Sequence, residues 1–240
     1  MLEVKHVSKR FGERLVLRDV SFRLSRGECA GLVGESGVGK STLCRLIAGL
    51  ERVDAGEILF EGSDLRTWRK KGRGRMSIVF QNYRASVNPR YKIIDILGEL
   101  LKRTSYQEKM KKMTALLDFV DLPSSILSRY PHELSGGELQ RICIARALSI
   151  DPHVLILDEP ISSLDAPVQV QILEVLKRIK EEKKTTMLFV AHHLESVVYV
   201  CDTVLFLIDG TIAERVTTNR LHDAENEIVR HVLKTVAERL

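Results

Sequence analysis

Residues 29–42 read CAGLVGESGVGKST, an apolar run followed by a glycine-rich loop, a lysine and two hydroxyl residues. The part from Gly34 to Ser41 fits G-x-x-x-x-G-K-[ST], a pattern in which a strand precedes the loop and a helix follows it. Apolar residues recur at i, i+3, i+4 and i+7 from Leu43 onward, which is typical of one helix face. Backbone amides at such a helix start can bind anionic oxygens. We therefore predict a phosphate-binding loop between a buried strand and a helix.

The loop residues themselves are the candidate phosphate contacts. Lys40 is expected to contact the outer phosphates of a nucleotide, and Ser41 is expected to bind Mg²⁺ through its hydroxyl. A glycine-rich turn that carries a lysine by chance is the alternative. The predicted nucleotide-binding residues of this loop are Gly34, Glu35, Ser36, Gly37, Val38, Gly39, Lys40, Ser41 and Thr42.

Short apolar runs recur along the chain, and each is followed by a turn or a helix pattern. Runs without polar alternation are typical of strands buried on both faces of a parallel sheet. By contrast, the alternation in 15–24, after the short run 2–7, predicts antiparallel strands with one buried face. The predicted fold class is therefore α/β, with a mostly parallel sheet and an antiparallel β subdomain. The apolar runs are CAGLV at 29–33, SIVF at 77–80, VLIL at 154–157, MLFV at 187–190 and VLFLI at 204–208.

Strand patterns disappear between residues 82 and 131, where helical apolar spacings take over. We predict one domain over residues 1–240, in which 1–81 and 132–222 form the core and 82–131 form an inserted helical lobe. Residues 223–240 are predicted to form one amphipathic helix whose ordinary role would be packing. Its apolar face would hold Ile228, Val232, Leu233 and Val236.

Composition narrows the class of protein. Lys and Arg outnumber Asp and Glu by 37 to 32, and the net charge of +5 permits a nucleic-acid partner without requiring one. The cysteines lie far apart without a C-x-x-C pair, which favours reduced thiols over a zinc site or a disulfide framework. The N-terminal stretch has no apolar signal core, and the longest apolar run, 197–208, is shorter than the roughly 20 residues that span a membrane. We expect a cytosolic chain.

Two acidic residues follow the apolar run at 154–157. Asp158 and Glu159 would lie at the carboxyl edge of a buried strand, where carboxylates are costly unless a cation offsets them. Asp158 suits the Mg²⁺ shell, and Glu159 suits a general base for the water that attacks a γ-phosphorus. A solvated strand end is the alternative interpretation.

Residues 134–140 read LSGGELQ, directly before an apolar helix pattern. This is a second glycine-rich helix start, and a chain whose first loop already holds the phosphates has no obvious use for another one in the same site. A second copy of the protein would have such a use. An ordinary serine N-cap with glycines beside it is the alternative.

LSGGELQ together with GESGVGKST resembles the ATP-binding-cassette (ABC) ATPases, and the resemblance covers nearly the whole chain. It implies a P-loop NTPase core that binds ATP and Mg²⁺. It also implies a head-to-tail dimer, in which the signature of one subunit closes on the γ-phosphate held by the Lys40 loop of the other. The signature residues in contact with nucleotide would be Ser135, Gly136 and Gly137.

Other positions follow the order of the same family. The resemblance implies adenine stacking by Phe11, a lobe-linking and metal-binding role for Gln81, and nucleotide contact by Asp165. Phe11 could instead be a core aromatic, and Gln81 could form only local hydrogen bonds.

The chain reads Ala191-His192-His193 where the family commonly has Ser-His-Asp. The spacing from the preceding strand favours His192 as the γ-phosphate switch, and His193 is the alternative. The predicted catalytic residues are Glu159, His192 and Gln81, and the predicted metal ligands are Ser41, Gln81 and Asp158.

Residues 81–90 read QNYRASVNPR, which looks like the region after the glutamine in peptide/nickel importer ATPases. SILSRYPHELSGGELQR is similar to the second, nickel-type ATPase of such systems, although peptide-type relatives share much of it. The resemblance implies a subunit at the cytoplasmic face of the membrane, paired with itself or a second ATPase subunit beneath two permeases. An extracytoplasmic binding protein would deliver a peptide, nickel or a metal chelate.

Other functions stay open at this point. A nucleic-acid- or ribosome-associated cassette could use WRKKGRGR at 68–75 to contact a phosphate backbone, although such a charge run is more often a solvated loop. No nucleic-acid partner is expected, because no second cassette, long coiled coil or zinc site is visible. An ABC exporter ATPase is a further alternative. A non-catalytic regulatory cassette is disfavoured by the presence of Lys40, Asp158 and Glu159.

Overall fold

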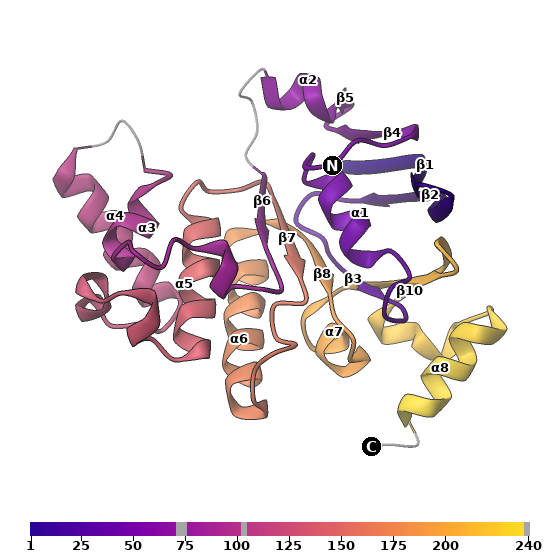
Figure 1. Ribbon diagram of the computed structural model, residues 1–240. Coiled ribbons are helices and arrows are strands. Elements are labelled where there is room, and N and C mark those ends of the chain that lie inside the picture. Colours follow the sequence, from indigo (N-terminus) through magenta and orange to yellow (C-terminus); the bar gives the residue numbers. More distant parts are fainter. Residues whose placement is uncertain (71–75, 102–104, 238–240) are drawn as a thin grey trace.

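The computed structural model describes residues 1–70, 76–101 and 105–237 of the chain. Within these ranges the strands form two sheets, one in the order β10-β9-β3-β8-β7-β6 and one in the order β2-β1-β4-β5. Figure 1 shows the smaller sheet on the opposite side of the molecule from helices α3 and α4. The larger sheet lies between them.

The larger sheet explains the continuous apolar runs of the sequence. Every residue of β3, β7 and β8 is buried, as expected for parallel strands covered on both faces. β6, β7, β8, β3 and β9 pair in parallel, whereas β10 closes one edge antiparallel to β9. The strands are β3 (Cys29–Val33), β6 (Met76–Val79), β7 (Val154–Asp158), β8 (Thr186–Val190), β9 (Thr203–Ile208) and β10 (Thr211–Thr217). The predicted mostly parallel sheet is confirmed.

The smaller sheet is antiparallel throughout. It contains β1 (Leu2–Phe11), β2 (Arg14–Leu24), β4 (Ala55–Phe60) and β5 (Ser63–Asp64). On β2, Leu17, Val20 and Leu24 are fully buried, which agrees with the predicted one-sided strands. β4 and β5 were not predicted, because the first three residues of β4 are exposed and include Gly56, so no regular alternation marks the strand.

Helices connect the parallel strands and cover both faces of the larger sheet. They are α1 (Lys40–Ile47), α5 (Gly136–Leu148), α6 (Ala166–Arg178), η4 (Ile179–Lys183) and α7 (Leu194–Val200). Alternate residues of one strand pack into different apolar clusters. On β7, Leu155 and Leu157 join the cluster that contains α5 and α6, whereas Val154 and Ile156 join the cluster of α1 and the smaller sheet. Successive side chains of a strand point to opposite faces of the sheet. The larger sheet therefore has an apolar core on each of its two faces.

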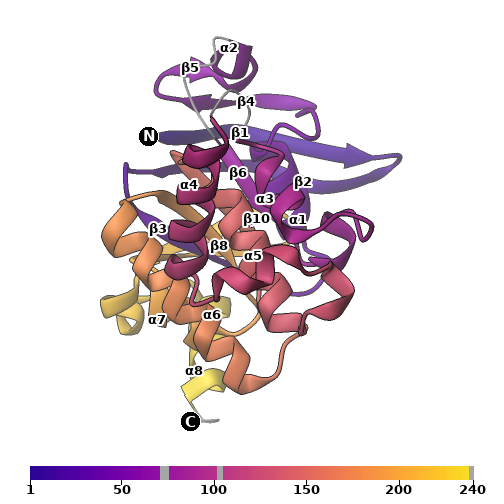
Figure 2. The same cartoon turned by 90° about the vertical axis from the view of Figure 1, so that its left-hand side faces the viewer.

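The described residues between 82 and 131 contain helices and no strand. Figure 2 shows this helical side of the molecule facing the viewer. Its elements are η1 (Arg84–Ser86), α3 (Ile93–Gly98), α4 (Tyr106–Phe119) and η2 (Ser124–Ser128), and η3 (Pro131–Glu133) follows. Buried residues such as Ile93, Leu97 and Leu117 belong to the same apolar cluster as α5 and β7. The division into a core and an inserted lobe stays a prediction.

The C-terminal helix α8 spans Glu227–Ala237, and Asp223 ends the preceding η5 (Thr218–Asp223). The predicted apolar face is wrong at Ile228, which is 53% exposed, because Val229 is the residue that is fully buried. The Asn226 side chain accepts hydrogen bonds from the amides of both residues at 3.0 and 3.2 Å, which fixes the start of the helix. Val232 and Leu233 are partly buried against the larger cluster. Residues 238–240 and the Val236 side chain lie outside the described parts.

The basic run at 68–75 is described only in part. Residues 71–75 lie outside the described ranges, and α2 (Leu65–Lys70) contains Trp68. Trp68 is only 3% exposed, and its ring centroid lies 4.4 Å from that of Phe60. This tryptophan is therefore part of the core and does not offer a surface ring to nucleic acid. None of the described helices is both long and apolar enough to span a membrane.

Candidate nucleotide-binding site

The loop from Gly34 to Gly39 joins β3 to α1 and depends on its glycines. A Cβ atom at Gly34 would lie 2.3 Å from the carbonyl oxygen of Leu207. Gly37 and Gly39 have φ angles of 78° and 116°, a region that favours glycine. Gly39 is the N-cap of α1, and no described side chain caps that helix start. The amides of the first turn are therefore available to a ligand.

Lys40 lies beneath this loop and is only 4% exposed. Its Nζ donates hydrogen bonds to the carbonyl oxygens of Gly34 at 2.7 Å and Glu35 at 2.8 Å. Burial lowers the pKa of Lys40, and the nearby carboxylates Glu159 and Asp158 oppose that shift. The ammonium group is thus held within the loop, close to two carboxylates.

Ser41 and Asp158 form the oxygen-rich part of the site. The Ser41 Oγ donates a hydrogen bond to Asp158 Oδ1 at 2.9 Å, which joins the start of α1 to the end of β7. Burial raises the pKa of Asp158, and the hydrogen bond from Ser41 partly offsets this effect. Hydroxyl and carboxylate oxygens are the donors that Mg²⁺ prefers. The two side chains therefore fit a magnesium ion chemically.

Glu159 is the centre of a hydrogen-bonded group drawn from three strands. Gln81, which follows β6, donates from Nε2 to Glu159 Oε2 at 2.9 Å and to Ser162 Oγ at 3.3 Å. His192, which follows β8, brings its Nε2 to within 2.7 Å of Glu159 Oε1. Both carboxylate oxygens of Glu159 thus have a partner. The structure brings together all three residues that were predicted as catalytic.

These groups surround one open cavity of about 310 Å³. It includes Arg14, which was not predicted as a site residue because no motif in the sequence marks it. The Arg14 Nη2 donates to the carbonyl oxygen of Gly37 at 3.3 Å, so the arginine borders the phosphate-binding loop. The lining residues are Arg14, Val16, Ser36, Gly37, Gly39, Lys40, Ser41, Thr42, Gln81, Glu159 and His192.

Several predicted residues do not line this cavity. Four of them belong to the loop or lie at the end of β7, namely Gly34, Glu35, Val38 and Asp158, and three others lie elsewhere in the chain. Phe11, at the end of β1, is 47% exposed, and the Lys9 Nζ lies 5.2 Å from its ring centroid. Asp165 is the exposed N-cap of α6. The alternative switch residue, His193, is the exposed N-cap of α7 and also lies outside the lining.

The signature residues Ser135, Gly136 and Gly137 form the start of α5, away from the cavity lining. Ser135 Oγ accepts a hydrogen bond from the Glu138 amide at 3.2 Å, and the Glu138 carboxylate accepts one from the Ser135 amide at 2.8 Å. The hydrogen bond from the Ser135 amide is the main cause that lowers the pKa of Glu138, and the Ser135 side chain adds to it. The ordinary serine N-cap, which was the alternative interpretation, is therefore present in the single chain.

The two signature glycines are required for packing. A Cβ atom at Gly136 would lie 2.7 Å from the Tyr83 hydroxyl, and one at Gly137 would lie 2.4 Å from Val168 Cγ1. Both distances are too short for a larger residue without movement of its neighbours. The glycines therefore let α5 approach η1 and α6 closely.

A family model described as ABC transporter matches residues 17–162, a stretch that includes the phosphate-binding loop, Gln81, the signature and Glu159. The chain belongs to the ABC transporter family. As a member of that family it is an ATPase, as the sequence resemblance implied. The match agrees with the observed fold, because the two glycine-rich helix starts and the strand-end acidic residues all lie within it.

Similar proteins extend the ABC match over most of the chain. Oligopeptide transport ATP-binding protein OppF of Bacillus subtilis is 40% identical over 236 residues, which are 93% of this chain and 77% of the relative. A putative peptide import ATP-binding protein of Brucella ovis is also 40% identical and covers 91% of this chain and 71% of its own length. The dimeric ATP-binding cassette MJ0796, solved with ADP and Pi, matches with a TM-score of 0.80, 27% identity and coverage of 91% and 99%.

Proposed function

We propose that this chain is the ATP-hydrolysing subunit of an ABC importer whose cargo is a peptide. The observation that carries the proposal is 40% identity, over more than nine-tenths of the chain, to proteins named for oligopeptide transport and peptide import. Nickel and metal chelates become the second choice of cargo, because neither name mentions a metal. An exporter or a nucleic-acid-associated ATPase has no comparable support.

The proposed nucleotide site uses the open start of α1. The amides from Gly37 to Thr42 and the ammonium group of Lys40 bind the phosphates, in line with their positions around the cavity. Ser41, Asp158 and Gln81 would hold Mg²⁺, which neutralises phosphate charge when it is bound. The exposed ring of Phe11 stacks on adenine, and Arg14 adds a positive charge next to Gly37.

Glu159 acts as the general base in this proposal. Its carboxylate accepts hydrogen bonds on both oxygens, from Gln81 on one and from His192 on the other. Each carboxylate oxygen has a second lone pair that can accept from a water molecule, and the movement of one partner would make room for that water beside Glu159. His192 is the partner that leaves, because its exposed side can turn to the γ-phosphate. Oε1 then orients the attacking water, and Gln81 keeps the carboxylate in position.

A second ATPase subunit, identical or different, completes the site. Ser135, Gly136 and Gly137 lie outside the cavity of their own chain, so they are free to contact nucleotide bound by another subunit. Asp165 contacts the same interface. The chain would bind two permeases at the cytoplasmic face of the membrane, and an extracytoplasmic binding protein would deliver the cargo.

Reconstitution tests the proposal. The chain is combined with candidate permeases, a second ATPase subunit and a binding protein in vesicles, and uptake of labelled oligopeptide and labelled nickel chelate is measured beside ATP hydrolysis. We expect ATP-dependent peptide uptake, and we expect none with a Lys40→Ala chain. Hydrolysis that responds to DNA or ribosomes but not to permeases would overturn the importer assignment. ATP-dependent uptake of nickel chelate alone would overturn the peptide assignment.

A further inference from the structure

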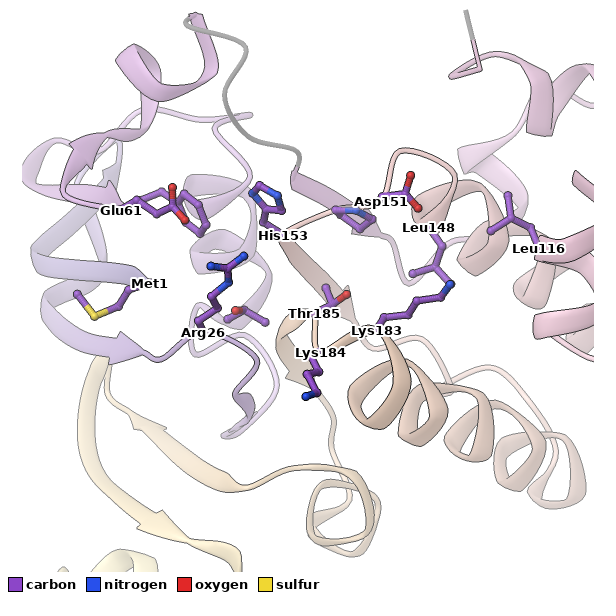
Figure 3. A pocket seen from close by; sticks show the side chains of 13 residues that line it. Met1, Arg26, Glu61, Leu116, Leu148, Asp151, His153, Lys183, Lys184 and Thr185 are labelled. Carbon is purple, nitrogen blue, oxygen red and sulfur yellow. The ribbon is translucent and has the colours of Figure 1, made fainter. Parts of the chain in front are cut away.

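A second cavity, of about 280 Å³, lies at the opposite edge of the larger sheet from the nucleotide site. Figure 3 shows that three loops meet there, each leading into a parallel strand. Arg26 precedes β3, His153 directly precedes β7, and Thr185 directly precedes β8. The end of β4 also contributes, through Phe60. None of the residues that line the nucleotide cavity lines this one.

One end of this cavity is cationic. Figure 3 shows the Arg26 guanidinium group directed toward the His153 ring. The described residues provide no ion-pair partner for Arg26, whereas Arg23 and Arg215 on the neighbouring strands pair with carboxylates. The Phe60 ring stacks against His153 with an interplanar angle of 18° and a centroid distance of 6.4 Å. The exposed guanidinium group therefore lies beside the His153 ring without an ion pair, and Glu61 is a carboxylate that lines the same end of the cavity.

Two leucines line the other end of the cavity. Leu116 and Leu148 line it at 7% and 3% exposure, and the stem of Lys183 runs beneath Leu148 in Figure 3. The Lys183 Nζ lies 5.0 Å from the ring centroid of Phe119. The cavity is thus an elongated space that has Arg26 and Glu61 at one end, and the two leucines with Asp151 and Lys183 at the other.

The charge balance of the cavity favours an anion. Arg26, Lys183 and Lys184 carry permanent positive charges, and Glu61 and Asp151 carry negative ones. The Asp151 charge is offset by Lys112, whose Nζ lies 2.6 Å from the carboxylate. An arginine fork matches the geometry of a carboxylate or a phosphate group and forms strong charge-assisted hydrogen bonds with either.

We propose that this cavity is an effector site for a small molecule that has an oxyanion group at one end and an apolar body. The carboxylate or phosphate group binds Arg26 and His153, and the apolar part points toward Leu116 and Leu148. The ligand thereby joins the amino ends of β3, β7 and β8. The carboxyl ends of these strands lead to the phosphate-binding loop, Asp158 and His192, and strands of five residues span roughly 15 Å. Binding at one edge therefore changes ATP turnover at the other.

The test uses phenyl phosphate and benzoate as probes and uncharged benzyl alcohol as the control ligand. The chain is first saturated with ADP and Mg²⁺, so that the phosphate-binding loop is occupied, and binding is measured by calorimetry. We expect at least one anion to bind about tenfold more tightly than benzyl alcohol, and the stronger anion identifies the preferred oxyanion. The same anion should change the rate of ATP hydrolysis at least about twofold.

Arg26→Gln and Lys183→Gln are the test variants, and Arg220→Gln is the matched control at an exposed arginine outside the cavity. We expect Arg26→Gln to weaken anion binding about tenfold and to abolish the change in turnover, and Lys183→Gln to weaken binding less. Arg220→Gln should behave as the unchanged chain. Absence of anion binding, displacement of the anion by ADP, or equal binding to Arg26→Gln would overturn the site. Bound anion with unchanged turnover would overturn its effector role.

Discussion

Helices α1 and α5 both begin in glycine-rich sequence, but of their two first turns only that of α5 is capped by a side chain in the described part of the chain. The start of α1 has no side-chain cap among the described residues, and Lys40, Asp158 and Glu159 lie around it. The start of α5 is closed by its own capping box, and none of its residues lines the cavity. A glycine-rich sequence alone therefore does not indicate which helix start is open to phosphate.

The contrast teaches how one nucleotide site is divided. The start of α1 brings together, within a single chain, the ammonium group of Lys40, the carboxylates of Asp158 and Glu159, and backbone amides that no described side chain caps. The α5 region offers a rigid, capped helix start whose glycines are fixed by Tyr83 and Val168. In the proposed function, such a surface adds contacts to a ligand that another subunit holds. The predictions below test each side of this contrast.

Glu159→Gln should have the largest effect, because it keeps the size and the polarity of the side chain but removes the base. We expect ATP hydrolysis to fall by about 10²–10⁴-fold while ATP binding is kept. Turnover and equilibrium binding of labelled ATP are the measurements, and Glu195→Gln, an exposed carboxylate on α7, is the control. Hydrolysis near the original rate in Glu159→Gln would mean that another group is the base.

His192→Ala should have the next largest effect on ATP hydrolysis. Only His192 reaches Glu159, whereas His193 is the N-cap of α7 and lies outside the cavity lining. We expect His192→Ala to reduce turnover by about 10²-fold, as for the loss of one transition-state hydrogen-bond donor, and His193→Ala to have a mild effect. Parallel steady-state assays compare the two variants. The opposite ranking would move the switch by one residue.

Ser135→Arg tests the α5 side. The added bulk should block ATP-driven closure between subunits without changing nucleotide binding to the isolated chain. We expect loss of the ATP-dependent dimer in size-exclusion chromatography and a fall in turnover of roughly tenfold or more. Ser105→Arg is the matched control, because Ser105 and Glu108 form the same kind of capping box on α4. If both variants dimerise equally well, the α5 start does not belong to the subunit interface.

Glu138→Ala should have the smallest effect, and it acts on stability. Loss of one half of the capping box should lower the free energy of unfolding by about 1 kcal/mol at pH 7. The pKa of Glu138 is lowered in the folded chain from its ordinary value of about 4.5, so the stabilising effect is present above that value. This stabilising effect is lost as the pH falls through the lowered pKa that Glu138 has in the folded chain. Urea titrations at pH 7 and pH 4 measure it, and a larger difference between the two chains at pH 4 would contradict this origin.

Local patterns in the sequence were enough to predict the parallel sheet, the phosphate-binding loop and the acidic pair Asp158 and Glu159. The apolar runs that end at Val33, Leu157 and Val190 predict strands, and chemistry at the carboxyl edge follows from parallel pairing. Gln81 and His192 were assigned through family resemblance, and the structure brings both to Glu159.

Other features depend on contacts that no local pattern contains. Arg14 borders the phosphate-binding loop only because β2 packs beside it. β4 is stabilised by its pairing with β1 and not by its own alternation. The rotation of α8 depends on Asn226, whose capping role shifts the buried face from Ile228 to Val229. Each of these outcomes is decided by tertiary structure.

Glu159 has a φ angle of 51°, in the left-handed region, and its amide donates to the carbonyl oxygen of Val190 at 3.2 Å. A glutamate in this conformation costs about 1 kcal/mol relative to a residue that adopts it freely. Replacement by glycine removes this strain and also a buried carboxylate, so Glu159→Gly should abolish turnover without lowering the melting temperature. A screen that selects variants by melting temperature alone would therefore keep Glu159→Gly, although this variant no longer hydrolyses ATP. Thermal resistance and catalytic competence must be selected together.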